Sequence, residues 1–360
     1  MTLPPVASTV GAMSGTRLNL VVLFGGESAE HDVSCVTAAH VIAAANASKY
    51  DITAIGIDRD GSWHRADASP SATASGRLTP SGDAVSLGEI SRKNTVVLPL
   101  LHGPLGEDGT VQGMLEVANF PYVGAGVLSS ALCMDKAMAK QIVAAAGLPQ
   151  PHFRAVHEPH FDASQVDEII ASVGLPMFVK PANMGSSVGV RKAKTRDEAL
   201  AAIGHAFVFD EWVLCEEAIV GREIEVAVLG NVTPEVSLPG EIVAGAEFYD
   251  YDDKYVNASA QLIIPAVLDA DQTRIVRELA ARVYGELRCE GMARVDFFFE
   301  EKGRGFLLNE VNTIPGFTPI SMYPKMWEAT GLSYDKLIDR LVELALDRHS
   351  RSKRGAQERK

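Results

Sequence analysis

The sequence predicts an α/β protein with two or three domains, and three observations support this prediction. Apolar runs of strand length alternate with Ala-rich stretches of helix length along most of the chain. The 360 residues are 47% hydrophobic, which is enough to bury more than one core. Several apolar runs end in glycine-rich polar loops, and in parallel sheets such loops lie at the strand ends where ligands bind.

Composition narrows the range of partners and compartments. The net charge of −13 argues against nucleic acid as the main partner. A membrane span is not expected, because no run of about 18 apolar residues is present. Residues 1–17, with Met13 as an alternative start, lack a secretory signal and are expected to form a flexible tail. The four cysteines form no Cys-x-x-Cys pair, which favours a reducing cytoplasm over a disulfide framework or a zinc site.

The first expected unit, residues 18–122, contains the strands and helices of an α/β domain. Strands are expected at 18–24, 52–57 and 95–101, and helices at 36–45 and 114–119. Residues 65–93 are rich in Ser, Ala, Gly and Pro, which indicates a surface excursion without a core of its own.

Two glycine-rich loops of this unit contain candidate binding residues. Glu30 lies in the loop after the first strand, and His102 lies in the loop after the third. Loops that follow successive parallel strands lie close together, so both residues are expected at the rim of one small-molecule site. The simpler alternative is that each residue caps the helix that follows it.

The next unit begins near residue 123, with helices expected at 135–146 and 158–173 and a strand at 175–181. Beyond this strand, Gly185 and Gly189 lie on either side of a serine pair. Such a loop leaves successive backbone N–H groups free to surround an anion, and Lys180 adds a positive charge nearby. The loop suits a triphosphate, although it lacks the Gly-Lys-Ser/Thr of a Walker P-loop. An ordinary β-turn is the alternative.

Residues 212–229 are expected to form two strands joined by a short connector, whose backbone can pair with an adenine edge while Glu223 reaches a ribose. The segment 239–257 is polar and rich in Tyr and Asp, which predicts a mobile lid or, alternatively, a surface loop without a role. Helices are expected at 270–287 and 334–346. The basic residues from Arg348 onward are expected to form a loose tail.

A hairpin near the end of the chain is the strongest candidate for a metal-nucleotide site. Side chains two apart on a strand share a face, so Arg294 and Asp296 project together, as do Glu310 and Asn312. Magnesium prefers oxygen ligands and completes its shell with water and phosphate, which suits the last three of these residues. The alternative is an exposed strand face with ordinary solvated charges. Apolar residues on the opposite face, among them Val295, argue against that alternative.

The order of these motifs resembles that of the D-alanine–D-alanine ligases of the ATP-grasp superfamily. The resemblance rests on GGESAEHDVS (25–34), LHGPLGEDGTVQGMLE (101–116), MDKAMAK (134–140), VKPANMGSSVGV (179–190), EEAIVGREIEVAVLG (216–230), YDYDDKY (249–255), ARVDFF (293–298) and NEVNTIPGFTPISMYP (309–324). It implies a three-domain ATP-grasp architecture with an N-terminal parallel-sheet (pre-ATP-grasp) domain. The implied bounds are 18–122 for the N-terminal substrate domain, 123–216 for the central domain and 217–347 for the C-terminal catalytic domain, with flexible tails at 1–17 and 348–360.

The resemblance also assigns roles to residues by motif position. It implies that ATP is bound by Lys136, Lys180, Gly185, Ser187, Glu216, Glu217, Ile219, Glu223 and Lys254. Two magnesium or manganese ions would be held by Asp296, Glu310 and Asn312. Glu30 would bind the ammonium of the first D-alanine with His102 nearby, and Ser321 and Met322 would place the second. Glu30, Ser186 and Tyr255 would form a hydrogen-bonded set, and Arg294 with the backbone N–H of Gly316 would stabilise the oxyanion.

The implied activity is the ATP-dependent joining of two D-alanine molecules through a D-alanyl phosphate, with release of ADP and phosphate, for peptidoglycan precursor synthesis. A homodimer in the cytoplasm, with K⁺ as a further ion, is expected. One alternative is a D-alanine–D-lactate or D-alanine–D-serine ligase, which Tyr255 discriminates because the lactate-using relatives have another residue there. A catalytically silent nucleotide-binding regulator is the other, and intact Lys180 and Arg294 argue against it.

Overall fold

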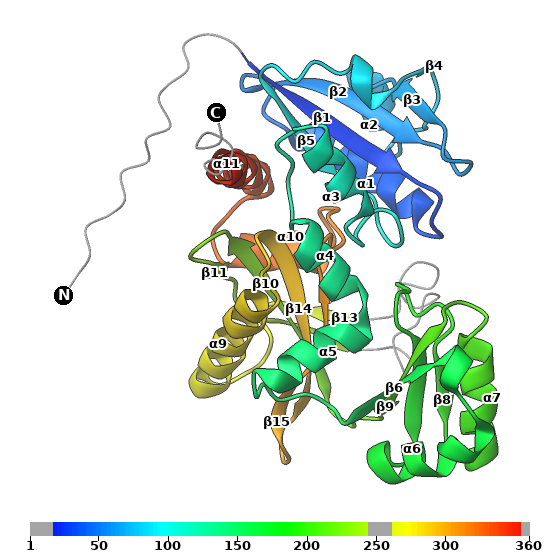
Figure 1. Cartoon of the computed structure of the whole chain (residues 1–360). Helices are drawn as coiled ribbons and strands as arrows, with labels where there is room; N and C mark the ends of the chain where they lie inside the picture. Colours follow the sequence, from blue (N-terminus) through cyan, green and yellow to red (C-terminus); the bar gives the residue numbers. More distant parts are fainter. Residues whose placement is uncertain (1–16, 244–260, 354–360) are drawn as a thin grey trace.

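The computed structural model describes residues 17–243 and 261–353, which form three sheets with helices packed against them (Figure 1). Figure 1 shows the N-terminal sheet at the top, the central sheet at the lower right and the C-terminal sheet between α9 and α5. No helix in the described part of the chain is long and apolar enough to cross a membrane. The α/β class predicted from the sequence is confirmed.

The N-terminal sheet has the strand order β4-β3-β2-β1-β5. The middle strand β1 (Leu18–Gly25) pairs in parallel with β2 (Tyr50–Ile57) and with β5 (Thr95–Pro99), as expected. Two further strands, β3 (Trp63–Ala66) and β4 (Asp83–Ala84), extend the sheet in the antiparallel sense, so the sheet as a whole is mixed. The helices of this unit are α1 (His31–Ala44) and α3 (Thr110–Val117).

The segment 65–93 has no core of its own, as expected, but a few of its side chains join the cores on the two faces of the N-terminal sheet. It contains the end of β3, the short helix α2 (Pro70–Ala74), β4 and the 3₁₀ turn η1 (Leu87–Glu89). Leu78, Val85 and Ile90 are buried in the two cores on either side of the N-terminal sheet. Three isolated apolar side chains are enough to attach a mostly polar segment to a core.

The central sheet is antiparallel, with the order β6-β9-β7-β8. Its strands are β6 (Phe153–His157), β7 (Met177–Pro181), β8 (Arg191–Ala193) and β9 (Trp212–Glu217). The helices α6 (Val166–Val173) and α7 (Arg196–Ala206) share one apolar core with it. Two helices precede the sheet, α4 (Val127–Met134) and α5 (Lys136–Ala145), and Asp135 caps α5 by accepting from the backbone of Met138 at 2.9 Å.

The helix expected at 158–173 is shorter than predicted. The 3₁₀ turns η2 (Glu158–His160) and η3 (Ala163–Gln165) come first, and α6 begins only at Val166. Pro159 lies at the start of η2, and the side chain of Asp162 caps η3. Each turn therefore has its own N-terminus, and the two turns do not join α6 into one continuous helix. The strand β6 before these turns was not predicted.

The C-terminal sheet has the order β13-β12-β10-β14-β15, and β11 (Glu235–Val236) also pairs with β10. The outer strands are β12 (Gly240–Val243) and β13 (Gln261–Ile263), and the central strand is β10 (Arg222–Gly230). The predicted hairpin is confirmed as β14 (Gly291–Glu300) and β15 (Gly305–Asn312). Helix α9 (Ala270–Glu286) lies where a helix was expected.

The expected lid at 239–257 begins as strand β12, because Ile242 and its neighbours pair with β10 and Ile242 is buried. The rest of that segment, with Lys254 and Tyr255, lies outside the described residues.

The last helix, α11 (Tyr334–Ser352), continues past the predicted start of a loose tail at residue 348. Arg348 donates to the backbone carbonyls of Tyr122 (2.8 Å) and Gly124, and its guanidinium lies 4.2 Å from the centre of the Tyr122 ring. Together with α10 (Met322–Ala329), α11 buries its apolar face in a core that also contains side chains of β1 and α1. A basic side chain in this place finds buried carbonyl partners, so the helix does not end where its apolar pattern does.

Candidate active site

A cavity of about 1280 Å³ is lined by residues from all three sheets and their loops. Every predicted site residue in the described part of the chain lines it, namely Glu30, His102, Lys136, Lys180, Gly185, Ser186, Ser187, Glu216, Glu217, Ile219, Glu223, Arg294, Asp296, Glu310, Asn312, Gly316, Ser321 and Met322. Lys254 and Tyr255 lie outside the described residues. The fold therefore brings motifs from the whole length of the sequence to one place.

The two glycine-rich loops of the N-terminal domain meet at this cavity. Ser28 Oγ donates to the backbone carbonyl of His102 at 2.7 Å, which joins the loops directly. Glu30 occupies the N-cap position of α1 but makes no capping hydrogen bond there. Its carboxylate instead accepts from Ser186 Oγ at 2.6 Å, across from the central domain. The prediction that the loops form one rim is confirmed, and the capping alternative for Glu30 is wrong.

His102 is 5% exposed and does not cap a helix either. Its Nδ1 lies 3.0 Å from the backbone carbonyl of Ile314, and an N–H at that position can donate to it. The other ring nitrogen, Nε2, is buried and has no hydrogen-bond partner among the described residues. Burial lowers the pKa of His102, although Glu30 opposes this effect. The lowered pKa favours a neutral imidazole, whose Nε2 is then an unpaired acceptor among the residues that line the cavity.

Glu107 lies beside this pair, and the sequence motif did not single it out as a site residue. Its carboxyl accepts from the backbone N–H of Gly103 at 2.9 Å. Burial and the nearby charge of Glu30 raise the pKa of Glu107 to about 8. The polar pair of Glu107 and Asp108 in the histidine loop was the available signal, but burial decides the charge of this carboxyl and cannot be deduced from spacing.

Glu216 is a buried carboxylate that lies between two lysines at the larger cavity. Glu216 and Lys140 are each 2% exposed, and the Glu216 carboxylate pairs with both Lys140 and Lys180. Burial alone would raise the pKa of Glu216, but the two ammonium groups outweigh it and lower that pKa. Burial lowers the pKa of Lys140 against the attraction of Glu216. Lys140 was not predicted, although it lies one helical turn from Lys136 on α5.

The serine loop after β7 adopts a strained conformation. Val188 N–H donates to the Gly185 carbonyl at 3.0 Å, so the loop is a β-turn, but Ser186 and Ser187 have φ values of 50° and 60°. Non-glycine residues in the left-handed region cost free energy, and successive N–H groups in such turns can surround an anion. Lys136 Nζ donates to the Met184 carbonyl at 2.6 Å and lies 3.9 Å from the Glu310 carboxylate, so this loop meets the hairpin.

In the hairpin, Arg294 lies opposite Asn312 and Asp296 opposite Glu310, so the four side chains share one face, as expected. Arg294 donates to both carboxylate oxygens of Asp296 at 2.8 and 2.7 Å and also pairs with Glu225 at 3.0 Å. Burial alone would lower the pKa of Arg294, but these carboxylates outweigh it and raise that pKa. Asp296 is 7% exposed, so the alternative of an ordinary solvated strand face is wrong.

The oxygens of this face suit a hard cation. The described residues contain no group of three or more His, Cys, Asp or Glu side chains placed to hold a metal ion. Asp296 and Glu310 are only two carboxylates, and Asn312, whose amide nitrogen donates to Asp296 at 2.9 Å, adds an amide oxygen. Such a sparse set fits magnesium, which takes few protein ligands and completes its shell with water and phosphate oxygens.

Ser321 lies at the N-cap of α10, where its hydroxyl accepts from the backbone N–H of Thr318 at 3.2 Å and contacts the Thr318 hydroxyl at 2.8 Å. Gly316 lies close by, since a Cβ there would be 3.2 Å from Ser321 Oγ. Met322 is 6% exposed and belongs mainly to the core beneath the cavity.

Two family profiles match the sequence. The profile described as D-ala D-ala ligase N-terminus matches residues 19–125, and the one described as D-ala D-ala ligase C-terminus matches residues 142–343. The chain belongs to the D-alanine–D-alanine ligase family.

Relatives with this family name match almost the whole chain. The D-alanine--D-alanine ligase of Caldicellulosiruptor bescii is 44% identical over 359 residues, which cover 94% of this chain and 98% of the relative. The D-alanine--D-alanine ligase A of Escherichia coli K12 is 43% identical over 354 residues, or 93% of this chain and 97% of the relative.

Solved structures of the family agree with the fold. The D-alanine-D-alanine ligase from Coxiella burnetii superposes with a TM-score of 0.83 at 36% identity and covers 95% of this chain and 97% of that chain. The VanG D-Ala:D-Ser ligase from Enterococcus faecalis superposes with a TM-score of 0.80 at 36% identity and covers 92% of this chain and 100% of that chain. The ATP-grasp architecture that the resemblance implied is confirmed.

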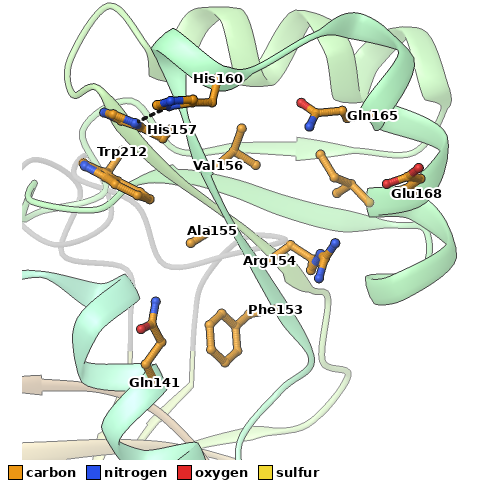
Figure 2. A pocket seen from close by; sticks show the side chains of 11 residues that line it. Gln141, Phe153, Arg154, Ala155, Val156, His157, His160, Gln165, Glu168 and Trp212 are labelled. Carbon is orange, nitrogen blue, oxygen red and sulfur yellow. Dashed lines mark hydrogen bonds between the residues drawn. The ribbon is translucent and has the colours of Figure 1, made fainter.

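A second cavity, of about 790 Å³, lies on the central domain and shares no lining residue with the first (Figure 2). In this cavity the His157 ring stacks on Trp212, with ring centres 4.3 Å apart. Nδ1 of His157 lies 3.0 Å from Nδ1 of His160. None of the residues that the family motifs assign lines this second cavity.

Proposed function

We propose that this protein joins two molecules of D-alanine to D-alanyl-D-alanine with consumption of ATP. The observation that supports this most strongly is the larger cavity, because Glu30, the serine loop at 185–189 and the oxygen-rich hairpin face all contribute residues to its lining. The product would serve as a peptidoglycan precursor.

The nucleotide would lie between the central and C-terminal sheets. Lys136 and Lys180, with the backbone of the loop at 185–189, would neutralise the phosphates. Glu216, Glu217, Ile219 and Glu223 would position the nucleoside, the middle two through backbone atoms. Asp296, Glu310 and Asn312 would hold two Mg²⁺ or Mn²⁺ ions, which would offset the negative charge of the phosphates. Lys254 would add a further phosphate contact, and K⁺ is a further candidate ion.

The first D-alanine would bind through its ammonium to Glu30, whose carboxylate is oriented by Ser186. A carboxylate is a poor acyl donor, so one of its oxygens attacks the γ-phosphorus of ATP and ADP leaves. The neutral amine of the second D-alanine then attacks the carbonyl carbon. Arg294 and the backbone N–H of Gly316 stabilise the oxyanion, and phosphate leaves as the peptide bond forms.

Ser321 and Met322 would place the second D-alanine, while His102 would lie near the first. A D-alanine–D-serine ligase is the second candidate. The VanG D-Ala:D-Ser ligase is 36% identical to this chain, as is the D-alanine-D-alanine ligase from Coxiella burnetii, and the two TM-scores are close. Tyr255, by family resemblance, disfavours D-lactate.

We also propose the domain bounds 18–122, 123–216 and 217–347, a homodimer, and a cytoplasmic location. The family resemblance supports the bounds and the homodimer, and the four free cysteines support the cytoplasmic location.

The test is phosphate release from ATP with D-alanine, D-serine, D-lactate or L-alanine, with the product identified by mass. We expect phosphate release and a D-alanyl dipeptide with D-alanine alone, and none with L-alanine. Phosphate release without a dipeptide, or equal rates with L-alanine, would contradict the proposal. A mixed product that is richer in D-alanyl-D-serine would favour the second candidate.

A further inference from the structure

The connector at 218–221, between β9 and β10, lines the larger cavity beside the residues assigned to the nucleoside. Its last residue, Gly221, runs so close to β14 that a Cβ there would lie 2.7 Å from the carbonyl oxygen of Phe299. The connector also joins the central sheet to the C-terminal sheet. Its placement therefore depends on what fixes its two ends.

The first end is fixed from the hairpin tip. Arg304, in the turn between β14 and β15, donates to both carboxylate oxygens of Glu217 at 2.9 and 2.7 Å. The same guanidinium donates twice to Glu300 at 2.9 Å. Glu217 is the last residue of β9 and also accepts from the backbone N–H of His152 at 3.2 Å. We call Arg304, Glu217 and Glu300 the Arg304 bridge.

The second end is fixed by Arg222, the first residue of β10. Its guanidinium donates to both carboxylate oxygens of Glu241 at 2.8 and 2.7 Å and to the Val267 carbonyl at 2.8 Å. A guanidinium thus holds the chain on each side of the connector. Isolated surface ion pairs add little to stability, but paired two-point contacts of this kind impose a defined geometry.

We propose that Arg304 is a positioning residue for ATP, because its bridge to Glu217 holds the connector backbone in the place that receives the nucleoside. The inference rests on the proposed function of the larger cavity. Arg304 itself does not line that cavity, so its effect on the nucleotide passes through Glu217. Its loss should therefore weaken nucleotide binding and leave the chemical step intact, because Arg294, Lys180 and the hairpin oxygens keep their places.

The test compares Arg304→Met with Arg274→Met, which removes an equally charged side chain from an exposed ion pair on α9. Both variants are assayed for kcat and for KM of ATP and D-alanine, and ATP binding without D-alanine is measured by calorimetry. For Arg304→Met we expect the KM and Kd of ATP to rise about five- to tenfold, with kcat at saturating ATP within about twofold. Arg274→Met should match the unmodified protein.

Two further variants make the test specific. Arg304→Lys keeps one ion pair and should restore part of the ATP affinity. Glu217→Gln should weaken ATP binding to a similar degree. The double variant should be no worse than either single variant, because both changes remove the same contact between Arg304 and Glu217.

The inference is overturned if the ATP affinity of Arg304→Met is unchanged, or if kcat and the KM of D-alanine worsen as much as the KM of ATP. Calorimetry also separates the two proposals. If the unmodified protein makes no dipeptide, the proposed function fails, whereas the change in ATP affinity still tests the bridge.

Discussion

Glu310 lies at the centre of the hairpin face, opposite Asp296 and 3.9 Å from Lys136. Its replacement by Gln keeps the shape of the side chain and removes its charge. Because this carboxylate is proposed to hold the metal ions beside the transferred phosphate, we expect kcat to fall by about 100-fold or more at saturating magnesium. Glu301→Gln, the same change at the exposed hairpin turn, is the control and should leave kcat unchanged. A Glu310→Gln variant with most of its activity would exclude the metal assignment.

Glu107 allows a second test at the scale of one residue, through the pH dependence of stability. Its pKa is raised from 4.5 to about 8, so the folded protein keeps a proton that the unfolded chain has released. The stability of the folded state must therefore fall as the pH rises from about 4.5 to 8. The charges that face this carboxyl come from Glu30, Lys136 and Glu310.

In Glu107→Gln the side chain does not titrate, so the variant does not lose stability through ionisation of this group. We expect the unfolding free energy of the variant, relative to the unmodified protein, to rise steadily between pH 5 and pH 8. Urea unfolding at several pH values measures it. A difference that is constant with pH would show that Glu107 is already ionised at pH 5.

At the scale of elements, α11 attaches the C-terminal domain to the N-terminal sheet. Asp339 on this helix is 5% exposed and accepts from Lys49 Nζ at 2.7 Å and from the Tyr50 hydroxyl at 2.8 Å. Asp339→Ala leaves the buried hydroxyl without its acceptor, so we expect a loss of about 2–4 kcal/mol in unfolding free energy.

The matched control is Asp335→Ala, at an exposed position one turn earlier on α11. It should cost less than about 1 kcal/mol. Equal losses in the two variants, measured by urea unfolding, would mean that the contact with Lys49 and Tyr50 does not hold α11 in place.

The elements that the sequence predicted well are those whose pattern is local. Strand β1 is mostly apolar, and in β14 the polar residues Arg294, Asp296 and Glu300 recur at even spacing among apolar ones, so the local pattern identifies both strands. The 3₁₀ turns before α6 were missed because the stretch has the composition of one helix. Pro159 and Asp162 each begin a separate short turn within it. The final turns of α11 were missed because Arg348 finds its partners at Tyr122 and Gly124, far away in the sequence.

The same distinction applies to the site. The motifs predicted Glu30, Asp296 and Glu310 as members of one site, and all three line the larger cavity. Lys140, Glu107 and Arg304 could not be predicted, because their surroundings depend on burial or on a partner that is far away in the sequence. A sequence shows which groups are present, whereas burial decides their charge and distant contacts decide what they hold.

At the scale of the whole molecule, the fold brings three sheets around one cavity and joins its N-terminal and C-terminal parts through one apolar core. This arrangement places the proposed ammonium site at Glu30 and the hairpin face at Glu310 on the same cavity. We propose that the carboxylate of one D-alanine is activated in this cavity as an acyl phosphate before the second D-alanine attacks.

The most direct test uses D-alanine with a heavy oxygen isotope in its carboxylate. If the carboxylate attacks the γ-phosphorus and the amine then displaces phosphate, the released phosphate must contain one labelled oxygen per turnover. Mass analysis of the phosphate formed together with D-alanyl-D-alanine measures this. We expect one labelled oxygen in each phosphate. Unlabelled phosphate, formed alongside the dipeptide, would contradict it.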